Sequence, residues 1–147
     1  MIETYKEMNA RHTAEFNALP LGFAFSKDQF KRVLEQWNIT EEEAEAGAIL
    51  SIGSGGFIRA TDKELYLETV KRIQEEENAA IEADKTGEGF IYQMFLYELR
   101  NHEFIITQDT DETLTALGIS EEDLKANAAL RYGLCKAIVT INSSDAE

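Results

Sequence analysis

Hydrophobic residues recur at two spacings along the chain, and these spacings predict both helices and strands. Apolar side chains three or four residues apart share one face of a helix. This pattern predicts helices over residues 5–19, 27–37, 61–83, 90–99, 109–117 and 120–141. Short aromatic and β-branched runs predict strands over residues 21–25, 48–52, 57–60 and 103–107. Strands and helices do not alternate regularly, so we expect an α+β fold, with five or six helices around a small, mostly antiparallel sheet of about four short strands.

Capping residues mark the starts of four helical segments. A Ser or Thr followed three residues later by an acid or Gln forms a capping box, which satisfies free amides at a helix start. Boxes begin at Ser26, Thr40, Thr61 and Ser120. The Thr40 box opens only a short acidic turn that Gly47 can end.

Two helices are expected to contribute most to the core. Residues 90–99 have apolar side chains around most of the helical wheel, which predicts a central buried helix. The long helix after Thr61 is expected to turn one apolar stripe inward, formed by Leu65, Tyr66, Val70, Ile73 and Ile81.

The glycine-rich segment 53–56 predicts a hairpin turn between two strands. Its Gly-Ser-Gly-Gly sequence permits the positive φ angles of a tight reversal. A phosphate-binding loop would need a further glycine where Ile58 stands and a helix after it. The spacing therefore favours a turn over a nucleotide loop.

Length and composition predict one globular domain. The chain has 147 residues and 44% hydrophobic residues, enough for a core without crosslinks. Its single cysteine, Cys135, permits no internal disulfide and is expected to be a small buried hydrophobe. No signal peptide or membrane span is recognised, so we expect a cytoplasmic protein. Residues of about 143–147 are expected to be disordered.

The net charge bears on the kind of partner. With 28 acidic and 14 basic residues the chain carries a formal charge of −14, and all of the excess lies after Trp37. Nucleic acids and anionic membranes repel such a chain, because they are bound through Lys and Arg. We therefore expect no direct nucleic-acid or membrane binding, and Trp37 is expected in the core rather than on a base-stacking surface.

Glu98, His102 and Glu103 form a cluster with candidate acid–base or metal chemistry, and the acidic segment 109–112 could bind a divalent ion weakly. Glu98 and His102 are one helical turn apart, and Glu103 follows directly. A zinc site needs three or four ligands, however, and His12 and Cys135 lie far away in sequence. A structural His102 at a helix end is favoured, and no catalytic residue, metal or cofactor is assigned.

Acidic side chains gather in clusters after residue 74. Helix starts favour acids, which explains several of them, but the run 75–77 falls in the middle of a helix. Plain solubility and recognition by a basic protein, including imitation of a phosphate backbone, both remain open. The candidate acidic interaction surface comprises Glu75, Glu76, Glu77, Glu82, Asp84, Glu88, Asp109, Asp111 and Glu112.

Several segments together resemble a known group of proteins. The segments are 24–26, 55–59, 89–104, 107–109 and 114–118, of which 89–104 is the most specific. They look like a family of small uncharacterised acidic proteins encoded in phages, plasmids and integrative elements of Gram-positive and gut bacteria. The likeness runs from Tyr5 to about Lys136 and implies genomic context rather than chemistry.

The resemblance adds two residues to the candidate patch around His102. It marks Tyr97 and Asn101, with His102 and Glu103, as the place to look for function. The segment 23–30 is also loosely similar to antirestriction proteins, which are acidic mimics of DNA.

We therefore expect a non-enzymatic cytoplasmic interaction protein that binds a basic partner. The alternative is a small-ligand or metal-binding protein, or an enzyme, that uses the His102 region. The oligomeric state is open, because the last helix can bury its apolar face within the chain or against a copy.

Overall fold

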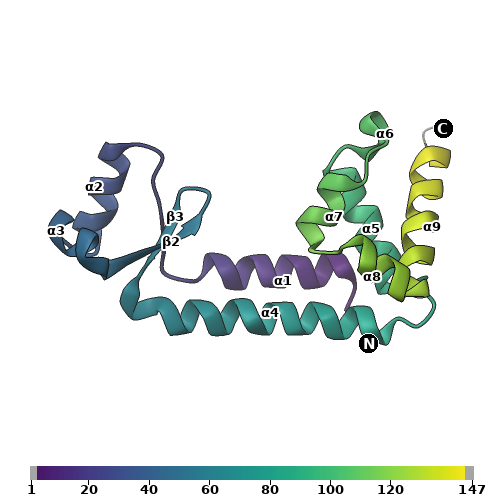
Figure 1. Ribbon diagram of the computed structural model, residues 1–147, viewed down its shortest axis with the longest axis horizontal. Helices are drawn as coiled ribbons and strands as arrows, with labels where there is room; N and C mark the ends of the chain where they lie inside the picture. The colour runs from purple at the N-terminus through teal and green to yellow at the C-terminus, as the bar shows by residue number, and fades with distance from the viewer. Residues whose placement is uncertain (1–2, 145–147) are drawn as a thin grey trace. The chain divides into compact units, whose positions relative to one another are not determined.

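The computed structural model describes residues 3–144, which pack as two compact units (Figure 1). Unit 1 is formed by residues 1–11 and 75–147, and unit 2 by residues 12–74. Helix α1, Tyr5–Asn17, begins in unit 1 and ends in unit 2. The long helix α4, Lys63–Ala83, begins in unit 2 and ends in unit 1.

The described residues confirm the α+β class but not the predicted counts. They form nine α-helices and a three-stranded sheet, instead of five or six helices and four strands. The elements are α1 Tyr5–Asn17, β1 Leu21–Phe23, α2 Lys27–Gln36, α3 Glu41–Glu43, β2 Ile49–Gly53, β3 Gly56–Arg59, α4 Lys63–Ala83, α5 Phe90–Asn101, α6 Phe104–Thr107, α7 Asp111–Leu117, α8 Glu121–Ala126 and α9 Ala128–Ser144.

Unit 2 contains the sheet, in the order β1-β3-β2 with both pairings antiparallel. Leu21 pairs with Ile58, and Ile49 with Arg59. The turn between β2 and β3 has positive φ angles at Gly53, Ser54 and Gly55. The predicted hairpin is therefore confirmed.

Aromatic rings join this sheet to α2. The Phe57 ring centroid lies 5.4 Å from that of Phe30 and 5.5 Å from that of Trp37. Gly22 allows β1 to approach α2, because a Cβ atom there would lie 2.7 Å from Val33 Cγ1. Trp37 is thus a packing residue, as expected.

Three of the four predicted helix caps are confirmed. The Ser26, Thr40 and Ser120 side chains accept hydrogen bonds from the amides of residues 29, 43 and 123. The cap at Thr61 is wrong. A 3-10 turn over Ala60–Asp62 precedes α4, and the ion pair of 2.7 Å between Arg59 Nε and Asp62 Oδ2 spans it.

The inward stripe predicted for α4 is only partly correct. Tyr66, Ile73 and Ile81 are half-buried, but Leu65 and Val70 are 50% and 37% exposed. No residue of α4 is fully buried. Helical spacing shows which side chains share a face, whereas burial also requires a neighbouring element that covers it.

Unit 1 is organised around the packing of α5 against α9 (Figure 1). The buried face of α5 confirms the predicted central helix, and α9 supplies the opposite face. The buried cluster contains Tyr5, Met8, Phe90, Ile91, Met94, Phe95, Leu99, Phe104, Ala129, Leu130, Ala137 and Ile141.

Gly133 of α9 permits the close approach of these two helices. A Cβ atom at Gly133 would lie 2.5 Å from Ile91 Cγ2 and 2.8 Å from the carbonyl oxygen of Gly87. Gly87 itself has φ +83°, and a Cβ atom there would lie 2.1 Å from the Ala129 carbonyl oxygen. Both contacts exclude a larger residue.

Asp84 fixes the start of α5. Its carboxylate accepts hydrogen bonds of 3.0, 3.1 and 3.0 Å from the backbone amides of Gly87, Gly89 and Ile91. Partial burial alone would raise the pKa of Asp84, but these hydrogen bonds outweigh it and hold the pKa below its usual range. The sequence predicted only a break in this segment.

The strand predicted over residues 103–107 is wrong. The β-branched pair Ile105 and Ile106 suggested it, but these residues form the single helical turn α6, with left-handed residues Glu103 and Gln108 on either side. The Gln108 amide donates to the Phe104 carbonyl at 2.7 Å, which closes a helical turn instead of pairing with a strand.

The helix predicted over residues 120–141 is two helices. Asn127 interrupts it, and its Oδ1 atom accepts hydrogen bonds from the amides of Ala129 and Leu130 at the start of α9. Residues 143 and 144 were predicted to be disordered, but they form the end of α9. The remainder of the predicted disordered end, residues 145–147, lies outside the described residues. None of the helices described over residues 3–144 is long and apolar enough to cross a membrane.

The Asp84 carboxylate is predicted to stabilise unit 1 in a pH-dependent way. We expect Asp84→Asn to lower the free energy of unfolding at neutral pH by about 2 kcal/mol, because hydrogen bonds to a charged acceptor are lost. A folded pKa below the unfolded value means that this stability is lost as the pH falls, so the two proteins should converge below about pH 4. Urea unfolding measures both effects, and Glu82→Gln is the matched exposed control. A constant difference from pH 7 to pH 3 would contradict the assignment.

Candidate functional site

An open pocket of about 660 Å³ lies on the exposed face of α5, within unit 1. Helix α5 contributes residues spaced by three or four positions, which places them on one face. The start of α1 supplies the opposite wall. The lining residues are Thr4, Lys6, Gln93, Leu96, Tyr97, Arg100 and Asn101.

Tyr5 ties the two walls of the pocket together. Its backbone amide donates to Gln93 Oε1 at 3.0 Å. Its buried ring packs at 5.5 Å from the Phe90 centroid and at 5.6 Å from the Tyr97 centroid. Tyr97 is therefore in contact with Tyr5 and remains 38% exposed.

The charges that line this pocket are positive. Lys6 and Arg100 are exposed, and within residues 3–144 neither side chain forms an ion pair or a hydrogen bond. Arg100 also lies in the last turn of α5, where its positive charge interacts favourably with the negative end of the helix dipole.

Glu98 and His102 do not line the pocket, and His102 lies next to α7. The Glu98 side chain is 12% exposed, and its Oε2 atom lies 3.8 Å from His102 Nε2. His102 Nδ1 lies 3.8 Å from Oε2 of Glu112, whose side chain is 82% exposed. The imidazole thus stands between two carboxylates, at distances longer than a hydrogen bond.

Glu98 also affects the buried Tyr5. Burial, and then the negative charges of Glu98 and Glu77, raise the pKa of the Tyr5 hydroxyl well above its usual range, and a hydrogen bond to Glu98 adds to the effect. The Tyr5 hydroxyl consequently stays protonated and can donate to the Glu98 carboxylate.

The structure divides the predicted patch around His102. Tyr97 and Asn101 line the pocket. The Glu98 side chain lies near His102 and Tyr5, and His102 lies near Glu112 of α7. Glu103 is an exposed left-handed residue between α5 and α6. Among residues 3–144, no group of three His, Cys, Asp or Glu side chains could hold a metal ion. Catalysis or metal binding by this region stays a prediction.

Sequence reasoning missed the cationic lining. Lys6, Gln93 and Arg100 line the pocket, but none of them belongs to a recognised motif. Spacing along residues 93–101 could have placed Gln93 and Arg100 on the Tyr97 face. It gave no indication that the start of the chain supplies Lys6.

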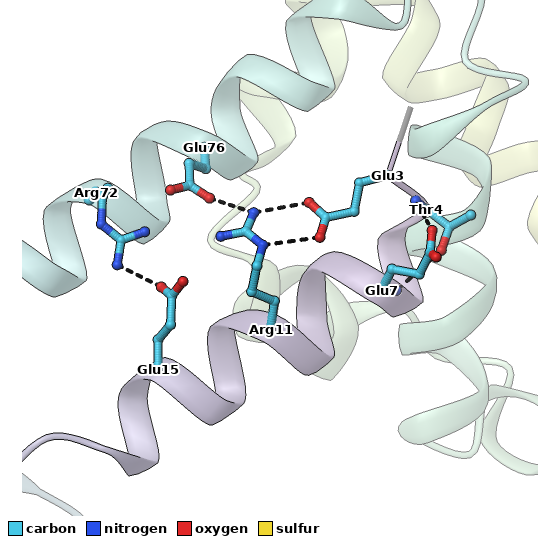
Figure 2. Close-up of polar contacts among 7 residues, drawn as sticks. All are labelled: Glu3, Thr4, Glu7, Arg11, Glu15, Arg72 and Glu76. Atoms are coloured by element: carbon cyan, nitrogen blue, oxygen red, sulfur yellow. Dashed lines mark hydrogen bonds and ion pairs between the residues drawn. The ribbon is translucent and has the colours of Figure 1, made fainter. Parts of the chain in front are cut away.

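All nine residues of the acidic interaction surface lie in unit 1, but they differ in exposure. Glu76, Glu77 and Asp84 are half-buried. Figure 2 shows the reason for Glu76: its Oε1 atom lies 2.6 Å from Arg11 Nη2, and Arg11 also forms two hydrogen bonds with Glu3. The six exposed members are Glu75, Glu82, Glu88, Asp109, Asp111 and Glu112.

Cys135 and His12 differ in exposure. Cys135 is exposed on α9, so the expectation of a buried thiol is wrong. Its apolar neighbours in sequence suggested burial, but the contact face of α9 passes through Gly133 and Ala137 instead. His12 is buried.

Comparison with protein families identifies the group to which this chain belongs. Residues 4–140 match the family of unknown function DUF7659, and the chain is a member of that family. Comparison with curated proteins and with solved structures gives no match. The family assignment confirms the expected membership of an uncharacterised family.

The buried Tyr5 is predicted to make stability fall at high pH. Its folded pKa lies above the unfolded value of about 10, so the free energy of unfolding should decline as the pH rises beyond that value. Tyr5→Phe should remove this part of the decline, which amounts to at most about 1.4 kcal/mol per pH unit. Chemical unfolding between pH 8 and about pH 10.5 measures it. Parallel curves for the two proteins would contradict the assignment.

Proposed function

We propose that this chain is a non-enzymatic interaction module that binds a basic partner protein through the acidic surface of unit 1. The proposal includes the cytoplasmic setting and the origin in a mobile genetic element that the sequence resemblance implies. The observation that carries it is the unequal division of charge between the two units.

Unit 1 holds most of the excess negative charge. It contains 18 of the 28 acidic residues and seven of the 14 basic ones, a formal charge of −11, whereas unit 2 carries −3. Such a charge attracts a basic protein over roughly the Debye length, about 8 Å at physiological salt, and accelerates its association. Nucleic acid and anionic membrane are repelled for the same reason.

The exposed carboxylates stand on elements that are fixed to the core of unit 1. Glu88 Oε1 accepts a hydrogen bond of 3.0 Å from the Tyr132 hydroxyl of α9. The buried Thr113 of α7 donates to the Glu98 carbonyl at 3.4 Å, which connects α7 with α5. A rigid arrangement of charges favours recognition, because little side-chain and backbone entropy is lost on binding.

The ion pair between Glu76 and Arg11 removes Glu76 from the proposed interaction surface. The mid-helix run 75–77 suggested imitation of a DNA backbone, but Glu76 is half-buried and ion-paired with Arg11. The interaction therefore rests on the six exposed carboxylates, and DNA mimicry by the complete run is the less favoured form of the proposal.

Removal of three exposed carboxylates is predicted to weaken binding of the partner. The test variant combines Glu82→Gln, Asp111→Asn and Glu112→Gln in unit 1. Three exposed ion pairs of about 0.5 kcal/mol each correspond to about a tenfold loss of affinity. Affinity capture from a cell lysate, at low salt and at about 0.15 M salt, identifies salt-sensitive partners, and titration with the purified partner gives the affinity.

The matched control removes the same charge from unit 2 through Glu42→Gln, Glu45→Gln and Glu68→Gln, all at exposed positions. It should bind as the unmodified protein does. Equal weakening by both variants would show that only net charge matters. Absence of any salt-sensitive basic partner would remove the proposal.

A further inference from the structure

The pocket on α5 combines two cations, an aromatic ring and two amide side chains. The cations, Lys6 and Arg100, line it together with Leu96 and the exposed Tyr97. The amide side chains of Gln93 and Asn101 complete the wall. A volume of about 660 Å³ falls within the range of small-molecule sites, about 300–1,000 Å³.

Arg100 differs from four of the other five arginines of the chain, and Arg32 of unit 2 is the other one without a side-chain partner within residues 3–144. Acids outnumber bases 28 to 14, so an arginine readily finds a carboxylate. Arg11, Arg59 and Arg72 each form an ion pair, and Arg131 donates to two carbonyl oxygens. Arg100 has no such partner within residues 3–144, although it lies in the acidic unit. Its guanidinium therefore remains available for an anion from outside.

The remaining lining groups suit a planar ring. The Tyr97 ring packs against Tyr5 at an interplanar angle of 56°, and the residue stays 38% exposed, which leaves ring surface for an aromatic ligand. Because Gln93 Oε1 already accepts from the Tyr5 amide, its NH₂ group is left to donate. The Asn101 side chain offers both a donor and an acceptor, as a base edge requires.

We propose that this pocket binds a small aromatic anion of the mononucleotide kind, with its ring on Tyr97 and its phosphate held between Lys6 and Arg100. A longer nucleic acid is excluded, because the charge of −11 on unit 1 repels every additional phosphate. The pocket is independent of the acidic interaction surface, so either proposal can fail alone.

Calorimetric titration of the full chain with three probes tests the ligand class. Adenosine monophosphate carries both the ring and the charge, adenosine only the ring, and inorganic phosphate only the charge. Adenosine monophosphate should bind at least about tenfold more tightly than either fragment, since one charge-assisted contact is worth about that factor. Adenosine binding as tightly as the monophosphate, or no binding of the monophosphate, would overturn the proposal.

Single substitutions then locate the site. Lys6→Gln and Arg100→Gln should each weaken binding of the monophosphate about tenfold, and Tyr97→Ala should weaken it similarly. Lys85→Gln, at an exposed position of unit 1 outside the pocket, removes the same charge as Lys6→Gln and should leave binding unchanged. All these positions are exposed, so circular dichroism is expected to show an intact fold. Unchanged affinity in both pocket cation variants, or equal loss with Lys85→Gln, would overturn the assignment.

Discussion

The close packing of α5 against α9 is the constraint on which unit 1 depends. Gly133 leaves no side chain where the two helices meet, so Ile91 and the Gly87 backbone can occupy that space. The Asp84 carboxylate then binds three amides at the start of α5 and sets where that helix begins. Burial of the large side chains of α5 supplies the favourable free energy, and these backbone contacts determine its geometry.

Helix α5 contributes both to the core and to the cationic pocket of unit 1. Its buried face carries the core, and the face with Tyr97 and Arg100 forms the cationic pocket. The acidic residues project from elements that α5 and α9 hold in place. A module of this kind can present negative charge to a basic protein and still accept a small anion, because the pocket cations act over a few ångströms, whereas the net charge acts over the Debye length.

The parts of the fold that depend on local sequence were predictable. The apolar residues of α5, the hairpin at Ser54 and the caps at Ser26 and Ser120 are read from neighbouring positions alone. The predictions that were wrong or missing concerned features that depend on residues far apart in the chain. Within residues 3–144, Ile105 and Ile106 have strand propensity but pair with no strand, and Leu65 has helical spacing but stays 50% exposed. The pocket that Lys6 and Arg100 line joins residues far apart in the chain. Of the candidate patch, Tyr97 and Asn101 share the pocket, while His102 caps α5 and lies near Glu98 and Glu112.

Substitution of Gly133 by alanine tests the central role of this helix contact most directly. In a helix that lacked such a contact, Gly→Ala would raise the free energy of unfolding by up to about 1 kcal/mol. Here the new methyl group would overlap Ile91 and the Gly87 carbonyl, so we predict a loss of about 1–3 kcal/mol in urea unfolding. Cys135→Ala, at an exposed position of the same helix, should change little. A Gly133→Ala protein more stable than the unmodified chain would contradict the account.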